Sequence, residues 1–466
     1  MVLSGFTFHR VVFSAVLALS GLSVLCRGSE ITEVAGTLPE DYLPGLKTIL
    51  ADALKRSPEM IARDFERILQ DEKLKMAKSA RLPSAGGNFD YGVSQTATTS
   101  ANSSQYRNTG AQYNFSLGQA LWHWGAIKNE ITIARISVQV LREDTARLYR
   151  DTALNLRKAY LALIVQKARV GHARQGIELL KAAVQVATIK KEDGTISGAV
   201  LEGEKLRLRE AELQLNRLSA DFEVNRRNFA RLAGMREIPE DAIPADIPRP
   251  VYHEAIAAAV AAKTLRENAR GTIEYNIYDL RLQQALLRQK IVATRLLPKF
   301  GIGVGYSLQN NTNVNGATVT QEAVTQQRVA VSGSWTFFDG FYTGAAKREA
   351  AISRRGLEYK KATEIEELLA TVQQLERTLK FDAESLALAD IRHGIATTAE
   401  EVAAEGIKLG HLPKVQGERA RVDILQAYAA MLEARATFLS RWAELMATTG
   451  EDPVLHNLSD RNAAKK

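Results

Sequence analysis

The chain of 466 residues repeats itself. The stretches RLPSAGGNFDYGVS at 81–94 and RLLPKFGIGVGYS at 295–307 share a Leu-Pro step followed by an alternating run of aromatic and small residues. Three pairs of landmarks recur at an offset of 215 or 216 residues: Pro83 and Pro298, Gly194 and Gly410, Gly234 and Gly450. A constant offset over so long a stretch indicates a tandem duplication, so the fold must be built from two copies of one unit.

The duplication divides the chain into a leader, two repeats, a linker and a tail. Between the repeats lies REIPEDAIPADIPRPVY, whose four prolines predict an irregular linker. We expect a signal peptide at 1–29, a linker at 239–251 and a tail at 451–466. The first repeat is expected at 30–238, with strands at about 86–121 and a long helical hairpin at about 125–234. The second repeat is expected at 252–450, with strands at about 299–338 and a long helical hairpin at about 344–450.

Residues 1–29 have the layout of a secretory signal. His9 and Arg10 precede the apolar run VVFSAVLALSGLSVL, which is too short to span a bilayer comfortably. Cleavage after Gly28 would remove Cys26, the only cysteine, and a disulfide framework is therefore impossible. Cys26 could instead accept a lipid, although the bulky Leu25 before it does not suit that signal.

The hydropathy period changes from 3.6 to 2 after each Leu-Pro step. In KFGIGVGYSLQ at 299–309, large apolar residues alternate with Gly, Ser and Gln, which predicts a strand with one apolar and one small, polar face. We expect the lipid-facing strand positions to include Phe300, Ile302, Val304, Tyr306, Phe115, Val329 and Trp335. The polar stretches 96–110 and 310–327 are expected to be long loops between the strands of each pair.

The composition of the two faces favours a transmembrane barrel over a soluble sandwich. A face rich in Gly, Ser, Asn and Gln suits a wet lumen better than a protein core, and aromatic residues flank the strand ends as at a membrane interface. Four strands cannot close a cylinder, and an open sheet edge is not tolerated in lipid. Copies of the chain must therefore associate, with two copies giving eight strands and three giving twelve.

Long helices are predicted on the far side of each strand pair. No proline occurs from Gly125 to Gly194, and apolar residues recur there at the 4-3 spacing of a packing seam. At 1.5 Å per residue this interval would be roughly 100 Å long, far more than a globular domain needs. An ordinary coiled coil without a pore would show the same seam, and the seam alone does not separate the two.

Other classes of function find little support in the composition. The formal charge of +8 comes from Lys and Arg interleaved with Glu and Asp along helices, which indicates solvated faces and no nucleic-acid partner. The seven histidines are scattered without ligand spacing, and no glycine-rich phosphate loop follows a strand. We therefore expect no enzyme activity, no cofactor and no metal site.

The chain resembles the TolC-type outer membrane factor, or outer membrane efflux protein, family over nearly its whole mature length. The resemblance rests on ALKRSPEM at 53–60, on the duplicated Leu82-Pro83 and Leu297-Pro298 steps, on Phe338-Asp339-Gly340 and on the spaced glycines. It implies an α+β membrane protein: a homotrimer whose twelve strands, four per chain, form one outer-membrane β-barrel continued by a long periplasmic α-helical barrel. The implied location is the cell outer membrane, extending into the periplasm.

The resemblance also implies where partners bind. Hairpin tips at Gly194, Thr195, Gly410 and His411 would dock a periplasmic adaptor protein, which links the duct to an inner-membrane pump. The family often has acidic residues six and nine positions after the second tip glycine, where this chain has Gln416 and Arg419. Glu418 and Glu202 lie nearby, so the periplasmic gate candidates are Gln416, Glu418, Arg419 and Glu202.

The implied function is a passive exit duct of a tripartite efflux or type I secretion system. The alternative is a pore-less coiled-coil protein that anchors the outer membrane to a periplasmic partner, and a third reading is a soluble two-domain binding protein. The sequence does not reveal the cargo.

Overall fold

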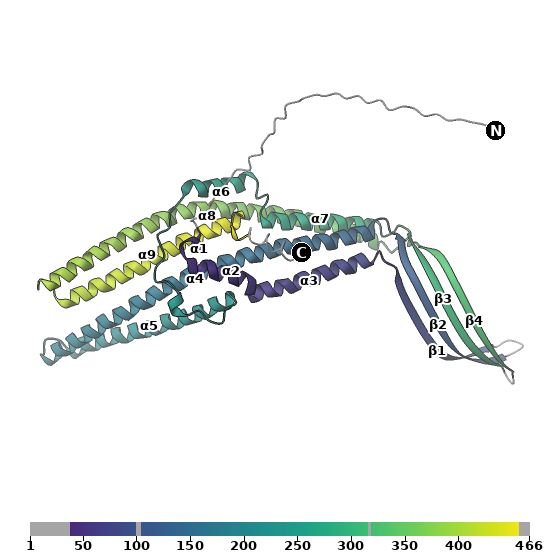
Figure 1. The fold of residues 1–466 in the computed structure, drawn as a ribbon, viewed down its shortest axis with the longest axis horizontal. Helices are drawn as coiled ribbons and strands as arrows, with labels where there is room; N and C mark the ends of the chain where they lie inside the picture. Colours follow the sequence, from purple (N-terminus) through teal and green to yellow (C-terminus); the bar gives the residue numbers. More distant parts are fainter. Residues whose placement is uncertain (1–37, 99–103, 316–317, 456–466) are drawn as a thin grey trace, which may run out of the picture. The chain divides into compact units, whose positions relative to one another are not determined.

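The computed structural model describes residues 38–98, 104–315 and 318–455 (Figure 1). All of these belong to one unit, Thr37–Lys466. The predicted signal peptide with Cys26 lies outside the described residues, as does most of the predicted tail at 451–466.

The elements form two similar series, each with shorter helices, then two strands, then a pair of long helices. The first series contains α1 (Pro39–Tyr42), α2 (Pro44–Arg56), α3 (Pro58–Ser79), β1 (Ser84–Thr98), β2 (Ser104–Trp122), α4 (Ala126–Glu192) and α5 (Gly198–Leu232). The second contains α6 (Glu254–Arg266), α7 (Ile273–Ala293), β3 (Lys299–Asn315), β4 (Thr318–Ser334), α8 (Tyr342–Lys408) and α9 (Lys414–Thr449). A 3₁₀ turn, η1 (Glu240–Ala242), lies between them in the proline-rich segment.

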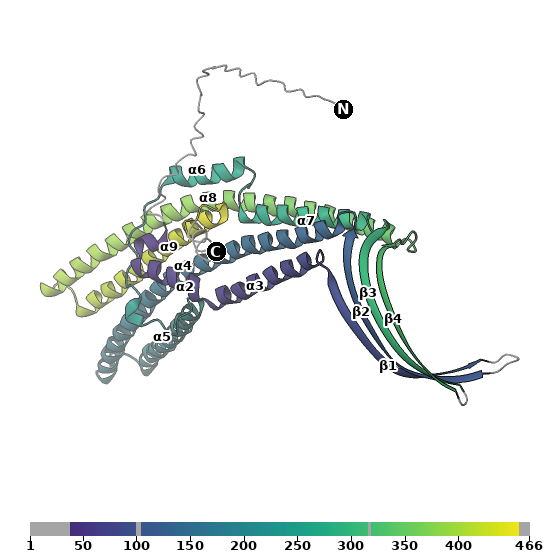
Figure 2. The same cartoon turned by 45° about the vertical axis from the view of Figure 1, so that its right-hand side comes forward.

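The four strands form one antiparallel sheet in the order β1-β2-β3-β4 (Figures 1 and 2). The two strand pairs, one from each series, meet where β2 pairs with β3. In the described strands, β1 and β4 each have a single partner, so both outer edges of the sheet are free.

The expectation of long polar loops between the strands was wrong. β1 continues to Thr98 and β2 begins at Ser104, while β3 continues to Asn315 and β4 begins at Thr318. These outer residues are mostly polar on both faces of the sheet, for example Thr312 paired with Thr109 on one face and Asn313 paired with Asn108 on the other. Backbone pairing continues without an apolar face to bury, which is why hydropathy alternation gave no sign of it.

The long helices form two hairpins that pack against each other. α4 and α8 contain 67 residues each; α5 returns along α4, and α9 returns along α8. α9 also packs on α4, and α7 lies between α4 and α8 (Figure 1). The largest side chains in the core lie on these helices and include Trp442, Tyr160, Phe229, Phe438 and Arg157.

Glycine ends each hairpin helix in the same way. Gly194, Gly234, Gly410 and Gly450 all have positive φ, between 68° and 81°. At the two tips the bond patterns match: Thr195 N donates to Lys190 O at 2.9 Å, and His411 N donates to Gly406 O at 2.8 Å. This is the six-to-one bond of a Schellman cap, which satisfies carbonyls that the helix leaves open.

Candidate channel-forming surfaces

One face of the sheet is apolar over part of its length. Register places Leu117, Val304 and Val329 in one row and Phe115 beside Tyr306 in the next. Phe300, Ile302, Val304 and Tyr306 alternate along β3 on this same face, so the predicted lipid-facing residues other than Trp335 share one side. Whether this side meets lipid stays a prediction.

The apolar stretch has a defined height. It runs along β3 from Phe300 to Leu308, beyond which the same face carries Asn310 and Thr312. Eight residue steps of roughly 3.4 Å give a length of about 27 Å along the strand, and with the strand tilt of about 40° in such barrels this corresponds to a height of roughly 20 Å. A lipid-facing band of an outer-membrane barrel is about 25 Å tall. Along β3 this face is thus apolar over most of the height of a bilayer core and mainly polar beyond it.

Tryptophan side chains tie the strand ends to the Leu-Pro steps. Trp124 Nε1 donates to Pro298 O at 2.7 Å, and Trp335 Nε1 donates to Leu296 O at 3.0 Å. Trp122 meets Trp124 edge to face, with ring centroids 6.0 Å apart. The prediction that Trp335 lies on a strand was wrong, because β4 ends at Ser334 and the Trp335 indole forms its hydrogen bond beyond the strand.

The strand-to-helix turns repeat a rare backbone conformation. Trp124 and Gly125 both have positive φ, and so do Gly340 and Phe341 at the matching place in the second series. Asp339 accepts bonds from Thr343 N at 3.1 Å and Thr343 Oγ1 at 2.5 Å, which caps the start of α8. This hydrogen bond from Thr343 is the main reason that the pKa of Asp339 lies below its usual value.

The helices also leave apolar faces uncovered. On α3 an exposed stripe contains Ile61, Phe65, Ile68, Leu69 and Met76. Along α8 and at its C-cap, five apolar residues recur every seventh position, and each is 63–66% exposed: Phe381, Leu388, Ile395, Val402 and the cap residue Leu409. We call this second set the α8 stripe. A repeat of seven residues is typical of a coiled-coil contact. The α8 stripe nevertheless has no described element packed over it.

The predicted gate residues lie in the first turns after the two tips. Gln416, Glu418 and Arg419 are on α9, whereas Glu202 is on α5 of the other hairpin. Glu202 binds Lys205 at 2.8 Å, and this bond is the main reason that the pKa of Glu202 is lowered. Glu418 lies 3.5 Å from Arg421, which also approaches Glu400. No contact within the described residues brings the two groups together, so their role as a gate stays a proposal.

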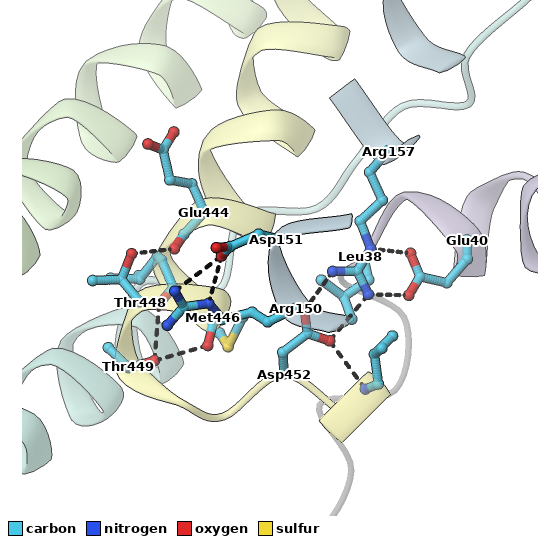
Figure 3. Close-up of polar contacts among 12 residues, drawn as sticks. Leu38, Glu40, Arg150, Asp151, Arg157, Glu444, Met446, Thr448, Thr449 and Asp452 are labelled. Carbon is cyan, nitrogen blue, oxygen red and sulfur yellow. Dashed lines mark hydrogen bonds and ion pairs between the residues drawn. The ribbon is translucent and has the colours of Figure 1, made fainter. Parts of the chain in front are cut away.

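Sequence reasoning missed a buried ionic cluster near the chain ends (Figure 3). Arg157 of α4 is fully buried and donates to Glu40 of α1 at 2.5 and 2.8 Å. It also donates to Asp452, just beyond α9, at 2.5 and 3.0 Å. Burial alone would lower the pKa of Arg157, but its hydrogen bonds to Asp452 and Glu40 outweigh this effect and raise it.

The proline-rich segment is also held more firmly than its composition predicts. Ile238, Ile243 and Ile247 are at most 1% exposed. Side chains of three helices donate to its carbonyl oxygens: Arg226 to Ile238, Lys167 to Glu240 and Ile243, Tyr160 to Ala242, Tyr428 to Ala245, and Arg435 to Ile247. We call residues 238–247 the strap, because it is bound to both hairpins.

Among the helices in the described part of the chain, none combines the length and the apolar character that a bilayer crossing requires. Within the same residues no group of three or more His, Cys, Asp or Glu side chains is arranged to hold a metal ion.

Comparison with known proteins identifies the family. The outer membrane efflux protein model matches residues 49–235 and 278–451, which is most of the chain. The chain therefore belongs to the outer membrane efflux protein family, a family of outer-membrane transport channels. No curated protein sequence matches it.

Solved channel structures share the fold at low sequence identity. The Campylobacter jejuni CmeC outer membrane channel is 12% identical, with 96% of this chain and 97% of that chain covered and a TM-score of 0.69. The Vibrio cholerae outer membrane protein VceC is 12% identical, with 88% and 98% covered and a TM-score of 0.65. The open state of the Neisseria gonorrhoeae MtrE outer membrane channel is 14% identical, with 87% and 89% covered and a TM-score of 0.62.

Proposed function

We propose that the chain is the outer-membrane exit duct of a tripartite efflux or type I secretion system. Three copies, each giving four strands, would close a twelve-stranded barrel in the outer membrane. Their hairpins would continue it as an α-helical barrel through the periplasm. The duct would conduct solutes or polypeptides passively, because energy would come from an inner-membrane transporter.

The proposal rests on the sheet, whose apolar face extends over most of the height of a bilayer core while both of its edges are free. An unsatisfied backbone group in hydrocarbon costs several kcal/mol. Joining β4 of one copy to β1 of the next would satisfy both edges at once. The opposite face, with Asn88, Asn114, Ser307 and Gln326 in one row, would then line a wet bore.

The uncovered helical faces support the same arrangement below the sheet. The α3 stripe and the α8 stripe each expose large apolar side chains to water in a single copy. Contact between neighbouring copies would remove that surface from water at about 25 cal/mol for each Å². In the proposed ring, neighbouring copies would thus contact each other through strand edges in the sheet and through the apolar stripes of α3 and α8 in the helical part.

Gating would take place at the hairpin tips. We propose that Gly194, Thr195, Gly410 and His411 dock a periplasmic adaptor, and that Gln416, Glu418, Arg419 and Glu202 lie at the entrance. An adaptor that binds the open arrangement more tightly than the closed one would shift the population toward it. The tandem organisation, with repeats at 30–238 and 252–450, would give each copy two such hairpins.

Conductance in planar bilayers tests the proposal. Purified protein, with its mass in detergent measured by light scattering, should form a trimer and open discrete, water-filled channels. Addition of a bulky side chain at Asn114, as in N114W, should lower single-channel conductance, whereas the matched change Y113W on the opposite face should not. A folded protein that stays a single subunit, or a trimer that never conducts, would favour the pore-less anchor instead.

A further inference from the structure

The charged residues of the sheet are not distributed evenly between its two faces. The described strands carry five of them: Asp90, Arg107, Lys299, Glu322 and Arg328. Register places four of these on the polar face and only Arg107 on the apolar side, opposite Val314 and beyond the apolar band. A charge on the polar face would project into the bore if the proposed barrel forms, so the sign and height of each charge matter.

Arg328 is the only charged residue in its row across the four strands. It pairs with Gly305, Gly305 pairs with Ser116, and Ser116 pairs with Gly86. None of these three neighbours has a side chain longer than a hydroxymethyl group, so the row gives a long cation free space. Arg328 is exposed and forms no ion pair or hydrogen bond with any residue that the structure describes.

The two carboxylates lie farther along the strands. Asp90 occupies the row of Gln309, and Glu322 occupies the row of Asn311. The row of Arg328 precedes that of Asp90 by four residues along β3, or about 13 Å. This separation exceeds the Debye length of about 8 Å at physiological ionic strength, so Asp90 in the same copy does not neutralise Arg328.

Height relative to the apolar band decides which charge has the larger effect. The row of Arg328, at Gly305, lies between Phe300 and Leu308 and hence within the apolar band, whereas the row of Glu322, at Asn311, lies beyond it. Asp90 lies between Phe89 and Tyr91 of β1, so the sheet is still apolar on the opposite face at this carboxylate. A wall of low dielectric constant focuses the field of a charge into the water of the bore. Beyond the band, water on both sides of the sheet screens Glu322.

We propose that Arg328 is a specificity-determining residue of the duct and gives its membrane-spanning bore a preference for anions. This inference rests on the proposed function, because three copies would place three Arg328 side chains at one height around the bore. Rings of Arg or Lys are a known way to favour anion passage through a pore. Lys299, at the end of the band nearest the helices, adds charge of the same sign, so each copy places two cations and one carboxylate, Asp90, along the band.

Reversal potentials in a potassium chloride gradient test this proposal on the whole trimeric protein in planar bilayers. The ratio of chloride to potassium permeability should fall at least about twofold in R328Q, as expected for a change of order kT in the bore potential. The ratio should fall further in R328E, and R328K should keep the native value. All of these differences should shrink as the salt concentration rises, because screening shortens the range of the charge.

R107Q is the matched control, because it removes the same charge from the same sheet outside the bore. It should leave the permeability ratio unchanged. Circular dichroism and trimer mass would verify that each variant folds and assembles. Native protein that forms no channel would refute the proposed function itself. Channels of native conductance whose ion preference is the same in R328Q, R328E and the native protein would overturn the role of Arg328 alone.

Discussion

Among individual residues, Arg157 joins the most distant parts of the chain. Its guanidinium connects α4 to Glu40, 117 residues away, and to Asp452, 295 residues away. All of its hydrogen bonds go to carboxylates, and both its own side chain and that of Asp452 are fully buried. Such a pair is costly to break from one side, because the remaining charge stays buried without compensation.

Removal of this guanidinium should therefore destabilise the protein strongly. R157M should lower the free energy of unfolding by about 3–5 kcal/mol, because Asp452 is left buried and unpaired. R157K should recover only part of the loss, since an ammonium group cannot bind two carboxylates in the planar, forked geometry of guanidinium. Loss of helical circular dichroism in detergent, followed against temperature and denaturant, would measure both effects.

The control for Arg157 lies on the same helix. Arg169 binds Glu433 at 2.6 Å, but these side chains are 46% and 55% exposed. R169Q should change stability by no more than about 1 kcal/mol, as for other surface ion pairs. Equal losses in R157M and R169Q would contradict the argument from burial.

Local and distant interactions differ in how far the sequence predicts them. The tip glycines could be foreseen, because a helix that must turn back needs a residue with positive φ, and Gly194 and Gly410 have it. The cluster of Arg157 could not, because each partner is an ordinary charged residue in its own segment. Only the fold brings positions 40, 157 and 452 together.

Among the elements, the strap is the one whose contacts the composition predicts least. The four prolines of the surrounding linker predict an irregular segment, and apart from the short turn η1 the strap is irregular. Composition does not say that its isoleucines are buried or that Lys167, Tyr428 and Arg435 hold its carbonyls. Only Pro244 separates the last carbonyl bound by α4, at Ile243, from the first bound by α9, at Ala245.

Removal of Arg435, one of the two donors on α9, should loosen the attachment of the strap to the second hairpin. Arg435 donates to Ile247 O at 2.7 Å and to Asp390 at 2.9 Å, and its side chain is only 12% exposed. R435M should cost about 1–3 kcal/mol, because it leaves buried acceptors unsatisfied. Limited proteolysis followed by mass spectrometry should show faster cleavage between residues 238 and 250.

A second arginine on α9 provides the comparison. Arg421 is 58% exposed and only approaches Glu400 and Glu418, at 3.7 and 3.5 Å. R421M should therefore leave both stability and the rate of cleavage in the strap nearly unchanged. If R435M resists proteolysis as well as the native protein does, the strap is held by its buried isoleucines and not by these bonds.

For the whole molecule, a single copy leaves too much apolar surface and too many strand edges open. The α8 stripe alone exposes five large side chains over four heptads, and the exposed stripe of α3 lies on another helix. A monomer rarely exposes a continuous apolar patch of this kind unless it binds another surface. The proposed trimer accounts for these faces and the free edges of β1 and β4 together.

A charge placed in the α8 stripe should therefore prevent assembly while leaving the single copy folded. I395D puts a carboxylate at a position that is 66% exposed in one copy, so its cost in the free subunit should be small. In the ring the same group would be buried against a neighbour without a partner, at a cost of several kcal/mol for each interface. Light scattering in detergent should then find single subunits of native helical content, whereas E401K, on α8 outside the stripe, should remain trimeric. A trimer of I395D as stable as the native one would mean that the α8 stripe faces something other than a second copy.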